Sequence, residues 1–285
     1  MTVLSFAVLL TSLCIVAAPF AGAVDSVALT STVRIPLTTV AGQAPLTLEA
    51  TLHKPAGNGP FPVVLYSHGA AGDPRLYKVT VKVQDFADAL ASRGVAVLAV
   101  MRVGRGASDG VYEEEPSACT VDAARAGIAS ASRSVDASIA WLRTQAWAKT
   151  DQIVLAGHSR GGILSTVYAA EHPGLVRGVI NFSGGWKNAN CASPDINLVI
   201  FESTASKPMP PQLFVYARGD FYYPVASVES YAQAARGNDG DLTFELYDKP
   251  NGFDGHQLFS KAFPIVRPTV EQFLSKLGLA KPVGM

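Results

Sequence analysis

The stretch Gln152-Ile-Val-Leu-Ala-Gly-His-Ser-Arg-Gly-Gly162 decides how this chain is expected to fold. Its first half is a short apolar, β-branched run typical of a buried strand, and residues 163–170 are compatible with a helix. A strand that turns sharply into a helix forces the serine between them into a strained backbone conformation, with its hydroxyl above the sheet. We therefore predict that Ser159 is a nucleophile. The alternative is a glycine-rich turn in which Ser159 only caps the helix.

Glycines flank this serine at Gly157 and Gly161. In so tight a turn, a Cβ at either position is expected to collide with the neighbouring strand or helix. The turn therefore requires glycine on both sides of the serine.

Strands and helices alternate along the rest of the chain. Apolar runs predict buried strands at 63–66, 94–100, 177–182, 211–217 and 242–247. Helical patterns are found at 81–93, 123–147, 196–203, 225–235 and 268–277, and alternating patterns at 27–37 and 46–53 predict two antiparallel edge strands. With the strand before Ser159, this order predicts an α/β fold: a mostly parallel, twisted sheet of eight strands with helices on both faces. In such sheets ligands bind at the carboxyl ends of the strands.

The first residues differ from the rest of the chain. Val3 to Ala18 is an almost unbroken apolar run, followed by the small-x-small cleavage pattern Ala21-Gly22-Ala23. No Lys or Arg precedes the run, so a mis-assigned start or an uncleaved hydrophobic anchor is the alternative. We predict a signal peptide over residues 1–23, one domain over 24–285, and a secreted or periplasmic protein.

Cysteine usage is consistent with export. Removal of the leader leaves Cys119 and Cys191, an even pair that we expect to be bridged in an oxidising compartment. Two buried free thiols are the alternative.

Charge excludes some partners. The 285 residues carry 23 basic and 23 acidic side chains, which are interspersed, so the formal net charge is zero. No basic face for nucleic acid or for an anionic membrane is indicated. We expect neither partner once the leader is removed.

A serine nucleophile needs a base, and histidine is suited to this because its pKa lies near neutrality. We predict His256 as the base, because it lies in a glycine-containing loop behind the last predicted strand. The other four histidines are disfavoured by position: His68 lies where its loop turns back, His158 adjoins the serine but points elsewhere, His53 lies in an early strand, and His172 lies at the wrong end of the sheet.

The acid that orients this histidine is predicted to be Asp220. It follows the strand at 211–217, and it gives the chain order Ser, Asp, His. Asp248 and Asp254 are rivals that share the histidine loop, although Asp254 is too close in sequence to approach the ring comfortably. A turn-forming role after Gly219 is the remaining alternative for Asp220.

The loop after the strand at 63–66, His68-Gly-Ala-Ala-Gly72, consists mostly of small residues. Its backbone can double back so that an N–H points toward the nucleophile. We predict an oxyanion hole from the N–H groups of Ala70 and Arg160, with Gly69 as the alternative donor. A plain glycine-rich turn is the other interpretation of this loop.

Candidate substrate-binding residues also follow strands. Arg102 could bind a phosphate or a carboxylate, or it could brace its own glycine-rich loop. Trp186, Phe221 and Tyr222 flank strand ends and are candidates for an aromatic pocket, although aromatic residues at such positions often belong to the core.

Together these motifs resemble the α/β-hydrolase superfamily. More narrowly, the chain is similar to the dienelactone-hydrolase-like and prolyl-oligopeptidase-like branch. The motifs that carry the similarity are Phe61-Pro62, His68-Gly-Ala-Ala-Gly72, Arg105-Gly-Ala-Ser-Asp109, Gly157-His-Ser-Arg-Gly-Gly162 and Gly255-His256. Dienelactone hydrolases proper have a cysteine nucleophile, so Ser159 favours a serine esterase instead.

The resemblance implies a secreted serine hydrolase that cleaves small carboxylic esters through an acyl-enzyme, with no metal or organic cofactor. In this superfamily the strands before Cys119 and Cys191 are separated by two others, so a bridge between them would bring their loops together near Ser159. A secreted peptidase or amidase with the same triad is one alternative function. A catalytically silent binding protein on a hydrolase scaffold is another.

Overall fold

The computed structural model describes residues 29–38, 44–115, 117–187, 195–238 and 240–281. The predicted signal peptide and Cys191 lie outside these residues, so the cleavage site and the Cys119–Cys191 bridge stay predictions. Within the described ranges, none of the helices combines the length and the apolar character needed to span a membrane.

The described strands form one eight-stranded sheet in the order β1-β2-β4-β3-β5-β6-β7-β8. β1 pairs antiparallel with β2, and β2 pairs antiparallel with β4, whereas the other neighbours are parallel. The predicted α/β fold with a mostly parallel sheet is confirmed. The strands are β1 (Leu29–Leu37), β2 (Leu46–Lys54), β3 (Phe61–Ser67), β4 (Ala96–Val100), β5 (Ala148–His158), β6 (Gly178–Phe182), β7 (Gln212–Ala217) and β8 (Leu242–Tyr247).

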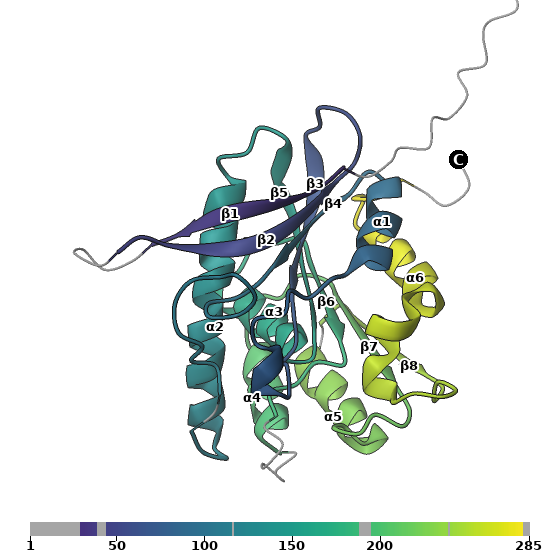
Figure 1. Ribbon diagram of the computed structural model, residues 1–285. Helices are drawn as coiled ribbons and strands as arrows, with labels where there is room; N and C mark the ends of the chain where they lie inside the picture. Colours follow the sequence, from purple (N-terminus) through teal and green to yellow (C-terminus); the bar gives the residue numbers. More distant parts are fainter. Residues whose placement is uncertain (1–28, 39–43, 116, 188–194, 239, 282–285) are drawn as a thin grey trace, which may run out of the picture.

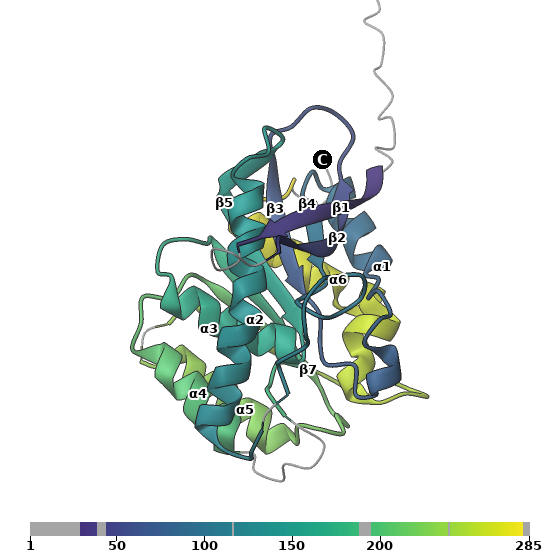
Figure 2. The ribbon, with the colours of Figure 1, turned by 60° about the vertical axis from the view of Figure 1, so that its left-hand side comes forward.

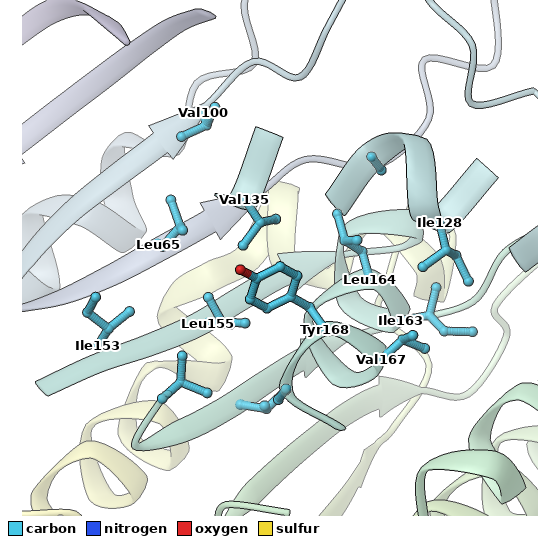
Figure 3. Packing of buried hydrophobic residues seen from close by; sticks show 14 of the residues in the cluster. Leu65, Val100, Ile128, Val135, Ile153, Leu155, Ile163, Leu164, Val167 and Tyr168 are labelled. Atoms are coloured by element: carbon cyan, nitrogen blue, oxygen red, sulfur yellow. The ribbon is translucent and has the colours of Figure 1, made fainter. Parts of the chain in front are cut away.

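Helices cover both faces of this sheet (Figures 1 and 2). The helices are α1 (Gln84–Ser92), α2 (Val121–Leu142), α3 (Arg160–Glu171), α4 (Asp195–Ala205), α5 (Val225–Arg236) and α6 (Leu258–Lys276), and the 3-10 turns are η1 (Pro74–Leu76) and η2 (Gly255–Gln257). One apolar core lies between the sheet and α2 to α5, and a second lies beneath α1 and α6. Figure 3 shows the first core, where Tyr168 of α3 lies among Leu155 and Val135.

Two helices depart most from their predicted limits. The helix expected over 123–147 ends at Leu142, and β5 begins at Ala148. The last helix was expected from residue 268, but α6 begins at Leu258. Its backbone leaves helical geometry at Ala262 (φ −145°, ψ 41°), so that Pro264 falls in the first turn of the segment that follows. A missing N–H is tolerated there, because first-turn N–H groups have no acceptor within the helix.

Candidate active site

Ser159 lies between β5 and α3 with φ 55° and ψ −119°. This left-handed conformation is unfavourable for serine, and neighbouring main-chain bonds hold it: the Ser159 N–H donates to the carbonyl of Phe182 at 2.9 Å. An added Cβ on Gly157 would overlap the carbonyl of Gly161, and one on Gly161 would overlap the carbonyl of Ser67. The predicted need for glycine at both positions is confirmed.

His256 and Asp220 form a buried pair beside this turn. His256 Nδ1 lies 2.9 Å from Asp220 Oδ2, and the two side chains are 9% and 0% exposed. Asp220 Oδ1 also accepts the backbone N–H groups of Tyr222 at 2.8 Å and Tyr223 at 3.1 Å. Because an ionised carboxylate only accepts hydrogen bonds, the proton of a neutral His256 is assigned to Nδ1, which leaves Nε2 with a lone pair. This is the form in which histidine can act as a base.

The two rival carboxylates are placed differently. The side chain of Asp248 is fully exposed to solvent and lies 3.9 Å from Arg218. Asp254 Oδ1 accepts the backbone N–H of His256 at 2.8 Å and that of Phe221 at 3.2 Å. Asp254 therefore holds the main chain of the histidine loop, whereas Asp220 contacts the ring.

Ser159 and His256 line the same cavity, whose volume is about 630 Å³. Among the other predicted site residues, Ala70, Arg160, Phe221 and Tyr222 also line it. Phe221 is 80% exposed at this cavity. The remaining lining residues are Ala71, Gly72, Pro74, Tyr77, Glu115, His158, Lys187, Tyr223, Asp254, Gln257 and Ser260. A second cavity of about 420 Å³, near Pro62 and Gln152, holds none of the predicted site residues.

Arg102 is not a substrate contact, so that prediction is wrong. Its side chain is 1% exposed and pairs with both carboxylate oxygens of Glu114, at 2.6 and 2.7 Å. The same guanidinium donates to the carbonyl of His68 at 2.5 Å. Arg102 therefore braces the loop that carries Ala70, whereas the alternative left open by the sequence was that it braces its own glycine-rich loop.

His68 is structural, as predicted. Its Nδ1 lies 2.7 Å from the carbonyl of Gly69, and its Nε2 accepts the backbone N–H of Arg102 at 3.1 Å. Burial, together with the charges of Arg102 and Arg105, holds the pKa of His68 well below its usual value. The neutral ring is thus part of the brace under the predicted oxyanion loop.

Trp186 is the second wrong prediction. Its side chain is buried and does not line the cavity. Its backbone N–H donates to Asn197 Oδ1 at 2.7 Å, and its ring lies 5.2 Å from the guanidinium carbon of Arg160. The turn after β6 thus directs this indole inward, which its position near a strand end does not reveal.

Arg160 lines the cavity, and its buried side chain is held by several hydrogen bonds. Its guanidinium donates to both oxygens of Glu115, at 2.9 and 2.8 Å, and to the hydroxyl of Tyr112 at 2.9 Å. Its backbone N–H is the first of α3 and has no acceptor within the helix. Sequence reasoning missed Glu115, Tyr77 and Lys187, because no local pattern distinguishes these residues in their loops.

Among the residues that the structure describes, no group of three or more His, Cys, Asp and Glu side chains could hold a metal ion.

The fold, with a serine at a strand-to-helix turn and a His–Asp pair beside it, defines the protein as an α/β-hydrolase. The chain belongs to the X-Pro dipeptidyl-peptidase (S15) family, whose model matches residues 27–193. A search of curated proteins gives no match. The predicted resemblance to the α/β-hydrolase superfamily is confirmed by this family match, and the esterase and dienelactone hydrolase structures that follow share the fold.

Several solved structures are similar over most of the chain. The esterase Pf2001 of Pyrococcus furiosus is 15% identical with a TM-score of 0.60, covering 86% of this chain and 90% of its own. Est1E of Butyrivibrio proteoclasticus with bound ferulic acid is 17% identical with a TM-score of 0.61, covering 81% and 96%. A dienelactone hydrolase of Anabaena variabilis is 19% identical with a TM-score of 0.57, covering 90% and 100%. At these identities the likeness establishes the shared fold.

Proposed function

We propose that this protein is a secreted serine hydrolase that cleaves small carboxylic esters through an acyl-enzyme. One observation carries the proposal: a strained Ser159 and a His256 that is bonded to the buried Asp220 line one cavity at the carboxyl ends of the strands. Nucleophile, base and orienting acid are the three parts that this chemistry requires.

In the proposed mechanism, Ser159 Oγ attacks the ester carbonyl carbon while His256 Nε2 takes the hydroxyl proton. The tetrahedral intermediate collapses, the C–O bond to the alcohol breaks, and His256 returns the proton to the leaving alkoxide. Water then attacks the acyl-enzyme in the same way, with His256 again as the base. Asp220 stabilises the imidazolium that forms in each step. No metal or organic cofactor takes part.

The developing oxyanion is assigned to the backbone N–H groups of Ala70 and Arg160. Both residues line the cavity with Ser159, and Arg160 begins α3. Preorganised N–H donors of this kind contribute about 3 kcal/mol each to transition-state stabilisation.

The family name favours a second candidate, a peptidase that acts on X-Pro substrates. We place esters first for two reasons. First, the family model ends at residue 193, before Asp220 and His256. Second, the similar esterase and dienelactone hydrolase structures cover 81% to 90% of the chain.

Export and the disulfide belong to the same proposal. The leader at 1–23 and the cysteine pair support a mature domain over 24–285 outside the cytoplasm, with Cys119 bonded to Cys191. Thiol titration of the unfolded, unreduced mature protein should find no reactive group. Two reactive groups would eliminate the bridge.

The central test is Ser159→Ala with two readouts. Wild type should react stoichiometrically with a fluorophosphonate and hydrolyse p-nitrophenyl acyl esters, whereas Ser159→Ala should lose labelling and at least about 10⁴-fold in kcat. Ser260→Ala is the matched control, because Ser260 lines the same cavity. If Ser159→Ala kept a tenth of the wild-type turnover, the mechanism would be wrong. An unlabelled wild type would indicate a silent binding protein, and a preference for Ala-Pro p-nitroanilide over the esters would select the peptidase.

A further inference from the structure

His158 directly precedes the nucleophile, and the mechanism above assigns it no role. Its Nε2 lies 2.8 Å from the backbone carbonyl oxygen of His256. A carbonyl oxygen only accepts hydrogen bonds, so the proton of a neutral His158 is assigned to Nε2. This hydrogen bond joins the end of β5 to η2, two segments that are 98 residues apart in the sequence.

The ring of His158 lies between the parts of the active site. Its centroid is 4.8 Å from that of His256 and 5.9 Å from that of Phe259, with which it stacks. On the other side, a Cβ built on Gly69 would lie 3.3 Å from His158 Nδ1, so the ring packs closely against the predicted oxyanion loop. One side chain therefore contacts both loops that flank Ser159.

The other bonds of the histidine loop hold it to a different neighbour. The N–H of Gly255 donates to the carbonyl of Gly219 at 3.0 Å, and the His256 ring is bonded to Asp220. Both contacts fix the loop relative to the end of β7. The contact from His158 fixes it relative to β5, whose end carries the nucleophile.

The pKa of His158 also suits a side chain that holds the histidine loop in place. Burial, with a smaller contribution from the charge of His256, lowers the pKa of His158 to about 3. The ring therefore stays neutral in the pH range of catalysis and places no second positive charge beside His256 when that ring accepts a proton.

We propose that His158 is a positioning residue: its Nε2–H holds the main-chain carbonyl of His256 and so fixes where the His256 imidazole meets the hydroxyl of Ser159. This inference rests on the proposed serine hydrolase mechanism. Partners that orient metal-ligating side chains typically contribute 10- to 100-fold, and we expect an effect of this size here.

The test compares two substitutions at this position. His158→Phe keeps a flat ring but removes the donor, so we expect kcat for a p-nitrophenyl ester to fall about 10- to 100-fold with KM changed less than about twofold. The rate of fluorophosphonate labelling should fall by the same factor. His158→Gln returns an amide N–H at the same reach and should restore kcat to within about threefold of wild type. His172→Phe is the control, because His172 stacks on Tyr168 away from the cavity.

Full kcat in His158→Phe would overturn the inference, and so would equal losses in His158→Phe and His158→Gln when circular dichroism shows that both are folded. The tautomer gives an independent readout that does not require a folded variant. Nitrogen NMR of histidine-labelled wild type should show His158 as the neutral Nε2–H form at pH 7, and an Nδ1–H form would also overturn the inference. If Ser159→Ala stays active, the proposed function fails; if only His158 proves dispensable, this inference fails alone.

Discussion

The two loops that flank Ser159 are held in place by different chemistry. The predicted oxyanion loop, residues 68–72, rests on a buried ion pair, in which Arg102 bonds to Glu114 and to the carbonyl of His68. The main chain of the histidine loop, residues 248–257, is held by single hydrogen bonds to Gly219 and His158 and by its own Asp254, and its His256 ring is bonded to the buried Asp220. The main chain of the oxyanion loop is therefore held by an ion pair inside the core, and the main chain of the histidine loop by separate hydrogen bonds around the cavity.

Because of this difference, substitutions at one loop should mainly affect stability and substitutions at the other should mainly affect activity. Removing one partner of a buried ion pair leaves an uncompensated charge, which costs about 3–5 kcal/mol of folding free energy. A single neutral hydrogen bond contributes about 1 kcal/mol. Substitutions under the oxyanion loop should therefore mainly lower the free energy of unfolding, whereas substitutions around the histidine loop should mainly displace His256 in a protein that remains folded.

Glu114→Gln should have the largest effect on stability. It leaves the buried guanidinium of Arg102 without its counter-charge, so the free energy of unfolding should fall by about 3–5 kcal/mol in urea titrations. Glu113→Gln is the matched control, because Glu113 is next to Glu114 in the sequence but is exposed. If the free energy of unfolding fell by less than about 1 kcal/mol, the ion pair would stabilise its loop no more than a single hydrogen bond does, and the two loops would not differ in this way.

Asp254→Ala should have an intermediate effect on stability and a larger effect on rate. It removes the acceptor of two backbone N–H groups, those of His256 and Phe221, at a cost of about 1–2 kcal/mol. We expect kcat to fall about tenfold with the protein still folded at 25 °C. Asp254→Asn keeps an oxygen acceptor and should stay near wild type, as should Asp248→Ala at an exposed position. If Asp254→Ala lost stability but no activity, the position of the His256 ring would not depend on the hydrogen bonds to Asp254.

Glu115→Gln should have the smallest effect on stability. Burial alone would raise the pKa of Glu115, but hydrogen bonds from Arg160 and Tyr112 outweigh burial and hold the pKa below its usual 4.5. Because the Glu115 side chain is 43% exposed, solvent screening limits the loss to about 1 kcal/mol or less at pH 7.

The pH dependence of that effect has a defined sign. The folded-state pKa of Glu115 is depressed, so its contribution to stability is present above the unfolded pKa and is lost as pH falls through the folded pKa. Urea titrations of wild type and Glu115→Gln should therefore differ at pH 7 and converge toward pH 3. A difference that grew at acid pH would contradict the assignment of the ion pair to Arg160.

The wrong predictions share a cause. Arg102 and Trp186 follow strand ends, as the predicted binding residues should, yet both side chains turn into the protein. Glu115 lies in an acidic loop without any pattern, yet it lines the cavity. In each case the direction of the side chain depends on what the rest of the chain places beside it, such as Glu114 beside Arg102.

The sequence by itself determined the order of strands and helices, the sharp turn at Ser159 and its need for flanking glycines. These features depend on hydrophobic periodicity and on local steric limits, which act over a few residues. Only the tertiary structure decided which loops reach the cavity, that Asp220 contacts the ring of His256 while Asp254 holds its main chain, and that His158 joins the two halves of the site. Those contacts link residues up to 98 positions apart, and they exist only when packing across the sheet brings the strand ends together.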